Sequence, residues 1–322
     1  MFDDGFLGGR EKKGKRAFKM RKIIEVKDFE KSYGEVKAVK GISFYVEEGK
    51  LFSFLGPNGA GKSTTIDTLC TLLEKDKGEI TVAGFDLQKK AHSIRQEIGV
   101  VFQESVLDDK LTVRENLTIR AGLYLKGRQA IKHAVEEVVA LISLEELINR
   151  PYGKLSGGQR RRADIGAALI HKPKILFLDE PTTGLDPQTR LMIWETIKNL
   201  QSNSGMTLFL TTHYMEEAAE SDYIIIINHG EVAARGTPSE LKNQYASDTL
   251  RIRTDDLEGV LKRLVFTELE AKEVGDELVF KIENAKEALG IIEELKDYVE
   301  DFEVKQGSMD DVFIGITGRE IR

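Results

Sequence analysis

The segment Gly56-Pro-Asn-Gly-Ala-Gly-Lys62-Ser63 has the residue types and spacing of a phosphate-binding loop. It follows the apolar run "LFSFL" and opens a helical pattern, which is the context in which G-x-x-x-x-G-K-[ST] binds nucleotides. The glycines let backbone N–H groups curl around phosphate oxygens, Lys62 can reach the β and γ phosphates, and Ser63 can ligate Mg²⁺. The residues predicted to bind here are Gly56, Pro57, Asn58, Gly59, Ala60, Gly61, Lys62, Ser63 and Thr64.

Two adjacent carboxylates, Asp179 and Glu180, end the apolar run "KILFLDE". Acids at the end of a buried strand are costly unless they meet a cation. Asp179 is placed to hold Mg²⁺ directly or through water, and Glu180 could polarise an attacking water. Together with Lys62, these acids predict a site that binds a nucleoside triphosphate with Mg²⁺ and hydrolyses it.

A second candidate phosphate-binding helix start lies at Ser156-Gly157-Gly158-Gln159, within "KLSGGQRRR". A serine and two glycines precede a long amphipathic run, and such a helix start offers free N–H groups and a partial positive charge. Two anion-binding helix starts in one chain need an explanation.

The ordered set of motifs resembles the ATP-binding cassette (ABC) family. "LSGGQ" is the signature of that family, and it stands shortly before "ILFLDEP" as the family requires. The resemblance implies that Tyr33 stacks on adenine and that Gln103 senses the metal and links the sheet to a helical insertion. It also implies that Asp186 belongs to the D-loop and that His213 is the switch residue that contacts the γ-phosphate.

The two helix starts are explained if the chain acts as a dimer. The fold cannot easily bring Ser156 onto its own phosphate loop, so a second copy or a related chain, turned head to tail, is the economical solution. Each ATP then lies between residues 56–64 of one protomer and residues 156–159 of the other. Whether the pair is a homodimer or a heterodimer stays open.

Short apolar runs separated by helical patterns dominate residues 21–244. Runs such as "KILFLDEP", "TLFLTTH" and "YIIIIN" suit strands buried on both faces, which is typical of a parallel sheet covered by helices. Residues from about 111 to 170 have an almost purely helical period. We predict an α/β fold: a P-loop NTPase core of the ABC ATPase type at 21–244, with a helical subdomain at about 104–172.

A smaller unit is expected at 245–322. Its patterns follow the order strand–helix–strand–strand–helix–strand, with a turn at Gly275-Asp276 and a helix cap at Asn284. This order matches a ferredoxin-like α+β domain. We expect this domain to be regulatory or dimer-supporting, and a plain stability extension is the alternative.

Composition narrows the classes of function. The 322 residues carry a net charge of −7, which argues against a general nucleic-acid binder. The single cysteine, Cys70, excludes a disulfide framework and suits the cytosol. Residues 1–20 are Gly-rich and then basic; we expect a solvated tail, with contact to anionic lipid as the alternative.

The sequence contains no apolar run as long as a membrane span. ABC ATPases mostly power membrane transport, so the resemblance to that family implies a chain at the cytoplasmic face of the cell membrane, with a separate integral membrane permease as its partner. "GGQRRR", "EPTTGLDPQTR", "THYMEEAA" and "SMDDVFIGITGR" resemble the multidrug and daunorubicin-resistance branch of the family. This resemblance implies the ATPase subunit of an exporter for a drug, antibiotic or similar solute, whose helical region after Gln103 receives a permease helix.

Three functions other than transport would also use a cassette of this kind. The insertion is too short for the coiled coil of a chromosome-maintenance ATPase, and one cassette is too few for a translation-factor ATPase, so we expect no nucleic-acid partner. A regulatory or scaffold cassette that does not drive transport is the remaining alternative. The presence of Lys62, Glu180 and His213 argues against it.

Overall fold

The computed structural model describes residues 21–264 and 270–318 of the chain. The predicted basic tail at 1–20 lies outside these residues. The central sheet has six strands in the order β10-β9-β3-β8-β7-β6, of which β10 alone pairs antiparallel. These strands are β3 (Leu51–Leu55), β6 (Ile98–Val101), β7 (Ile175–Asp179), β8 (Thr207–Thr212), β9 (Tyr223–Asn228) and β10 (Glu231–Gly236).

The central sheet is buried on both faces, as predicted. Along β7, Leu176 and Leu178 pack into a cluster with the helical insertion, whereas Ile175 and Phe177 pack into a cluster on the opposite face. Side chains alternate across a strand, so both faces need apolar residues when both are covered. This requirement explains the uninterrupted apolar runs of the sequence.

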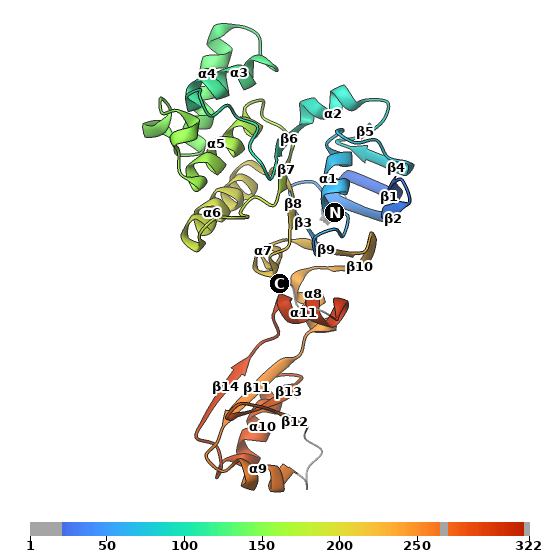
Figure 1. Ribbon diagram of the computed structural model, residues 1–322, viewed down its shortest axis with the longest axis vertical. Helices are drawn as coiled ribbons and strands as arrows, with labels where there is room; N and C mark the ends of the chain where they lie inside the picture. Colours follow the sequence, from blue (N-terminus) through green and yellow to red (C-terminus); the bar gives the residue numbers. More distant parts are fainter. Residues whose placement is uncertain (1–20, 265–269, 319–322) are drawn as a thin grey trace, which may run out of the picture.

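A four-stranded antiparallel sheet, ordered β2-β1-β4-β5, covers one face of the cassette. Helix α1 (Lys62–Leu69) lies between this sheet and the central sheet (Figure 1). Its helical hydrogen bonds end at Cys70, and Thr71 takes a positive φ of 63°, so α1 does not continue beyond Cys70. The remaining elements of this layer are β1 (Lys22–Tyr33), β2 (Val36–Glu47), β4 (Lys77–Val82), β5 (Phe85–Asp86) and α2 (Ala91–Glu97).

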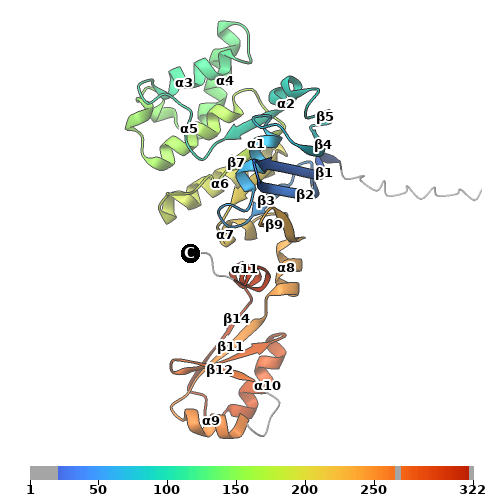
Figure 2. The same ribbon diagram turned by 45° about the vertical axis from the view of Figure 1, so that its right-hand side comes forward.

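The opposite face carries the helical layer, which is well separated from the antiparallel sheet in Figures 1 and 2. Its helices are α3 (Val113–Gly122), α4 (Arg128–Leu141), α5 (Gly157–Leu169) and α6 (Pro187–Ser204). Thr112, Ser156 and Asp186 cap three of them with their side chains. Polar caps of this kind satisfy backbone N–H groups that a helix start leaves free.

The C-terminal unit has the predicted ferredoxin-like order. Its antiparallel sheet is ordered β12-β13-β11-β14, and the two helices cover one face with a separate apolar cluster. In Figure 2 this unit lies below the cassette, at the far end of the long axis. Its elements are β11 (Asp248–Arg253), α9 (Leu257–Leu264), β12 (Ala271–Val274), β13 (Glu277–Ile282), α10 (Ala285–Leu295) and β14 (Asp301–Lys305).

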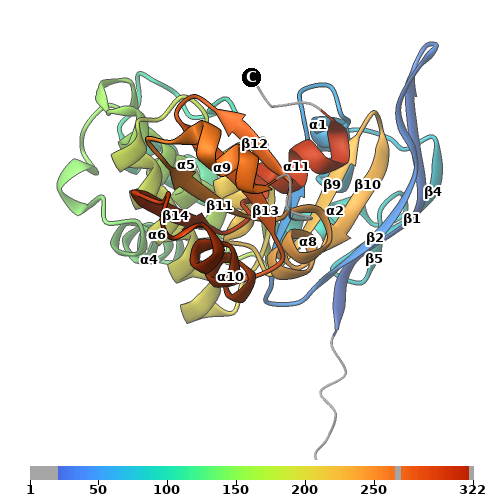
Figure 3. The same ribbon diagram turned by 90° about the horizontal axis from the view of Figure 1, so that it is seen from below.

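The last helix, α11 (Met309–Thr317), returns to the cassette. It packs on α8 (Pro238–Tyr245) and α7 (Met215–Ala219), beside β9 and β10 in Figure 3. A Cβ on Gly315 would lie 2.8 Å from the carbonyl oxygen of Tyr245, so close contact of α11 with α8 needs glycine there. Within residues 21–264 and 270–318, we find no helix with both the length and the apolar character of a membrane span.

Candidate nucleotide-binding and hydrolysis site

The candidate site forms where three parallel strands end in register. Leu55 of β3 pairs with Thr212 of β8, and Thr211 pairs with Asp179 of β7. The loop that begins at Gly56 therefore leaves the sheet at the same edge as Glu180 and His213. Residues more than 100 positions apart in the sequence meet here because their strands are neighbours.

The glycines of the phosphate loop are required by close packing and by backbone conformation. Gly61 has a φ of 106°, and a Cβ on it would lie 2.6 Å from the carbonyl oxygen of Ala38. A Cβ on Gly56 would lie 2.4 Å from the carbonyl oxygen of Ile227. Gly61 is also the N-cap of α1 and offers no side-chain cap, so the first N–H groups of α1 are available to an anion.

Lys62 is buried, with 5% of its surface exposed. Its Nζ donates to the carbonyl oxygens of Gly56 at 2.8 Å and Pro57 at 3.2 Å, and it lies 3.5 Å from Glu180 Oε1. Burial lowers the pKa of Lys62, and the carboxylates of Glu180 and Asp179 oppose that shift. A phosphate at the loop would give this cation a stronger partner than neutral carbonyls.

Asp179 ends β7 and is buried. Its Oδ1 accepts a hydrogen bond from the Thr211 hydroxyl. Burial raises the pKa of the Asp179 carboxyl; the Thr211 bond opposes that shift and the charge of Glu180 adds to it. An added cation at this carboxylate would therefore stabilise its ionised form.

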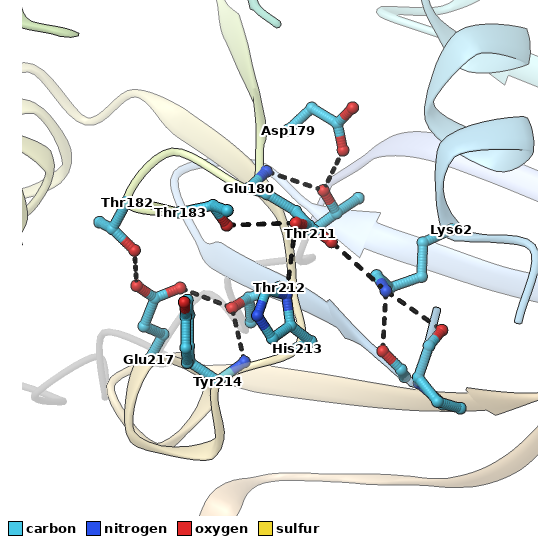
Figure 4. Close-up of polar contacts among 12 residues, drawn as sticks. Lys62, Asp179, Glu180, Thr182, Thr183, Thr211, Thr212, His213, Tyr214 and Glu217 are labelled. Carbon is cyan, nitrogen blue, oxygen red and sulfur yellow. Dashed lines mark hydrogen bonds and ion pairs between the residues drawn. The ribbon is translucent and has the colours of Figure 1, made fainter. Parts of the chain in front are cut away.

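Glu180 adopts an uncommon backbone conformation, with a φ of 42°. Its N–H donates to both the carbonyl oxygen and the hydroxyl oxygen of Thr211, each at 3.1 Å. Its carboxylate lies between Lys62 on one side and His213 on the other, and Oε2 accepts from the Thr183 hydroxyl at 3.1 Å (Figure 4). Strained backbone of this kind is common at functional sites.

His213 follows β8, and its Nδ1 lies 3.3 Å from Glu180 Oε2 but forms no hydrogen bond within the part of the chain that the structure describes. The segment after β8 that carries His213 is held in place by Glu217, whose side chain is buried with 2% of its surface exposed. The Glu217 carboxylate accepts hydrogen bonds from the hydroxyls of Thr182 and Thr212, as Figure 4 shows. Lys62, Asp179, Glu180 and His213 are thus brought together.

The predicted signature residues lie elsewhere. Ser156 and Gln159 form a capping box at the start of α5, with Ser156 N–H donating to Gln159 Oε1 at 3.0 Å. Helix α5 packs on the face of the central sheet opposite α1. The starts of α1 and α5 within one chain therefore do not meet at a common site. The glycines have a local role too, since a Cβ on Gly158 would lie 2.3 Å from Thr189 Cγ2.

Four other predicted residues make no hydrogen bond or ion pair, in the part of the chain that the structure describes, with the group formed by Lys62, Asp179, Glu180 and His213. Tyr33 ends β1 with 51% of its surface exposed. Gln103 and Ser63 are exposed. Asp186 caps α6: its carboxylate accepts from the N–H of Thr189 at 3.0 Å and from its hydroxyl at 2.6 Å, and these bonds lower the pKa of Asp186.

Several residues that hold the site belong to none of the motifs that predicted it. Thr211 and Glu217 lie in "LTTHYMEEA". Thr211 is the first of three polar residues that directly follow the apolar run "LFL", and that pattern was a usable signal for Thr211. Arg161 lies in "GGQRRR", where three consecutive arginines look alike in sequence. Only the structure shows that Arg161 is buried.

Known families and proteins resemble this chain over most of its length. A model described as "ABC transporter" matches residues 39–183, and one described as "ATP-binding protein DrrA1-3-like, C-terminal domain" matches residues 236–317. The linearmycin resistance ATP-binding protein LnrL of Bacillus subtilis is 36% identical over 93% of this chain and 100% of its own. The daunorubicin/doxorubicin resistance ATP-binding protein DrrA of Streptomyces peucetius is 36% identical over 92% of this chain and 93% of its own.

Solved structures of similar chains agree in fold. The ADP conformation of MJ1267, an ATP-binding cassette of an ABC transporter, has a TM-score of 0.64 and 28% identity, covering 69% of this chain and 94% of that one. A dimeric post-hydrolysis state of the ATP-binding cassette MJ0796, bound to ADP and Pi, has a TM-score of 0.61 and 29% identity, covering 67% of this chain and 98% of that one.

Proposed function

The chain belongs to the ABC transporter family of ATP-binding proteins, and from this premise we propose that it powers export through a separate membrane permease by ATP-dependent, head-to-tail dimerisation. It is an ATP-binding and ATP-hydrolysing subunit of the exporter type. One observation carries the hydrolytic part of the proposal: the Glu180 carboxylate lies 3.5 Å from Lys62 Nζ and 3.3 Å from His213 Nδ1.

In the proposed hydrolysis step, Lys62 exchanges its two carbonyl partners for oxygens of the β and γ phosphates. Water attacks the γ-phosphorus while Glu180 accepts the water proton. The bond from the γ-phosphorus to the bridging oxygen breaks, and ADP leaves with that electron pair. His213 lies beside Glu180 and holds the γ-phosphate, so that charge developing on the phosphate is stabilised.

The donor set fits Mg²⁺, which prefers oxygen ligands and keeps ligands from the substrate phosphates. The carboxylate of Asp179, the hydroxyl of Ser63 and the amide of Gln103 would hold the ion, which would neutralise phosphate charge. In the described part of the chain, no group of three or more His, Cys, Asp or Glu side chains could hold a metal. This arrangement of side chains suits a metal ion that takes some of its ligands from the substrate phosphates.

We propose that each ATP is enclosed between residues 56–64 of one copy and residues 156–159 of the other. Helix α5 and the phosphate loop pack on opposite faces of the sheet, so the N–H groups at the start of α5 need a second chain to reach a nucleotide. Tyr33, exposed at the end of β1, would stack on adenine, and Asp186 would lie at the dimer contact. The domain at 245–322 would regulate or support this dimer.

The permease would contact the helical layer, which would place the chain at the cytoplasmic face of the membrane. Val106, Ile119 and Leu123 expose between 59% and 67% of their surfaces in the segment after Gln103. Val106 lines a small cavity together with Arg120 of α3. Exposed apolar side chains of this kind suit a short permease helix.

Glu180→Gln tests the proposal. This variant should bind ATP, hydrolyse it only at a low residual rate and accumulate as a closed dimer in size-exclusion chromatography, because the γ-phosphate that both copies hold is removed too slowly. Glu216→Gln is the matched control, since Glu216 is exposed and its carboxylate lies 4.0 Å from Arg190. A Glu180→Gln protein that stays monomeric with ATP, alone and with its permease, would show that the proposed dimer is wrong.

A further inference from the structure

Arg161 is a buried cation whose partners are backbone carbonyl groups. It lies on α5, two residues after the signature, with 6% of its surface exposed. Its Nε donates to the carbonyl oxygen of Pro181 at 2.6 Å, and Nη1 donates to that of Phe102 at 2.5 Å. Nη2 donates to the carbonyl oxygens of Asp179 at 3.0 Å and Glu180 at 3.2 Å.

These contacts fix the backbone on both sides of Glu180. Arg161 holds the carbonyl oxygens that precede and follow the strained φ of Glu180, while Thr211 holds its N–H from the neighbouring strand. A non-glycine residue keeps such a conformation only where its surroundings impose it. The direction of the Glu180 carboxylate, between Lys62 and His213 in Figure 4, depends on that conformation.

The same helix also holds the loop that carries Gln103. Arg161 bonds the carbonyl oxygen of Phe102, directly before Gln103. One turn further along α5, Asp164 Oδ1 accepts from the hydroxyl of Ser105 at 2.6 Å, two residues after Gln103. Gln103 is therefore bracketed by two contacts from α5.

The two neighbouring arginines make different contacts. Arg160, on the same helix, donates to the carbonyl oxygens of Gly153 and Leu155, beside the signature itself. Arg162 donates to those of Ile142 and Ser143, inside the helical layer. Only Arg161 among the three joins α5 to the end of β7.

We propose that Arg161 is a positioning residue for hydrolysis, which orients Glu180 and the Gln103 loop from the signature helix. The proposal rests on the proposed function, in which residues 156–159 face the ATP held by the second copy. Each chain then connects two sites: Glu180 acts at its own phosphate loop, and α5 begins at the ATP of its partner. Arg161 is the side chain through which a shift of α5 reaches Glu180.

Arg161→Lys tests the proposal in the full-length chain, with Arg162→Lys as the matched control. Lysine keeps the charge, but its compact ammonium cannot span four carbonyl groups as a planar guanidinium does. We expect kcat for ATP hydrolysis to fall about tenfold or more in Arg161→Lys, with KM and the affinity for ATP changed less than about threefold. Arg162→Lys should keep the wild-type kcat.

A second measurement separates positioning from general stability. In a Glu180→Gln background, Arg161→Lys should cause no further loss of residual turnover, because residues that act through one another are not additive. A wild-type kcat in Arg161→Lys, an additive loss, or a variant that cannot be recovered folded would each overturn the proposal. If the wild-type chain has no ATP turnover, the proposed function fails instead, so the two failures are distinguishable.

Discussion

Gly158→Ala separates a packing role of the signature from a role in nucleotide contact. A Cβ on Gly158 would lie 2.3 Å from Thr189 Cγ2, which is far inside van der Waals contact, whereas Thr189 Cβ and Oγ1 would lie at 3.5 and 3.6 Å. Thr189 cannot turn away freely, since its hydroxyl donates to Asp186 at 2.6 Å. The clash therefore comes from one methyl group of α6.

The magnitude follows from two opposing terms. Overpacking by one methyl group costs about 1–3 kcal/mol, and alanine in place of glycine in a helix gains up to about 1 kcal/mol. We expect Gly158→Ala to lose about 1–2 kcal/mol of unfolding free energy. Thr189→Ser removes the clashing methyl and keeps the hydroxyl for Asp186, so the double variant should be at least as stable as Thr189→Ser alone.

Equilibrium urea denaturation measures the unfolding free energy of the wild-type chain, Gly158→Ala, Thr189→Ser and the double variant. ATP-driven dimerisation of the same variants is then measured in a Glu180→Gln background. If residues 156–159 contact the nucleotide of the other copy, the double variant should recover its stability and still form the closed dimer poorly. If Gly158→Ala costs as much unfolding free energy in the Thr189→Ser chain as it does in the wild-type chain, the packing argument is refuted.

Three further predictions concern other parts of the chain. Burial alone would raise the pKa of Asp222, but the three hydrogen bonds that its carboxylate accepts lower it. Asp222→Asn should lose about 1–2 kcal/mol of unfolding free energy at pH 7. Urea denaturation should show this difference shrink as the pH falls below the unfolded carboxyl pKa of about 3.9 and vanish below the lowered pKa of the folded state. Ile119→Glu should abolish co-purification with the permease and leave ATP-driven dimerisation unchanged. Leu289→Glu should retain the permease, since Leu289 lies on α10 and is exposed to a similar extent, 65% against 59% for Ile119. Phe313→Ala should cost about 3–5 kcal/mol in thermal unfolding followed at the cassette, because Phe313 of α11 shares a cluster with Leu55; a loss confined to the C-terminal unit would contradict this packing.

The sequence alone determined the type of site and the fold class. Gly56–Ser63, the acids that end "KILFLDE" and "LSGGQ" carry chemistry in their order and spacing, and apolar runs without alternation predicted a sheet buried on both faces. These are local properties: loop glycines, strand composition and helix caps depend on neighbours in the chain. Such local properties can be predicted from the sequence without knowing which strands pair.

Tertiary structure alone decided how the residues are held. Parallel pairing of β3, β7 and β8 brings Lys62 and His213 within ion-pair range of Glu180, and no local pattern specifies that pairing. Arg160, Arg161 and Arg162 are identical in sequence, yet the turn of the helix buries the middle one under the end of β7. Burial and long-range hydrogen bonds arise from the packing of distant segments, so only the folded chain shows which arginine supports the site.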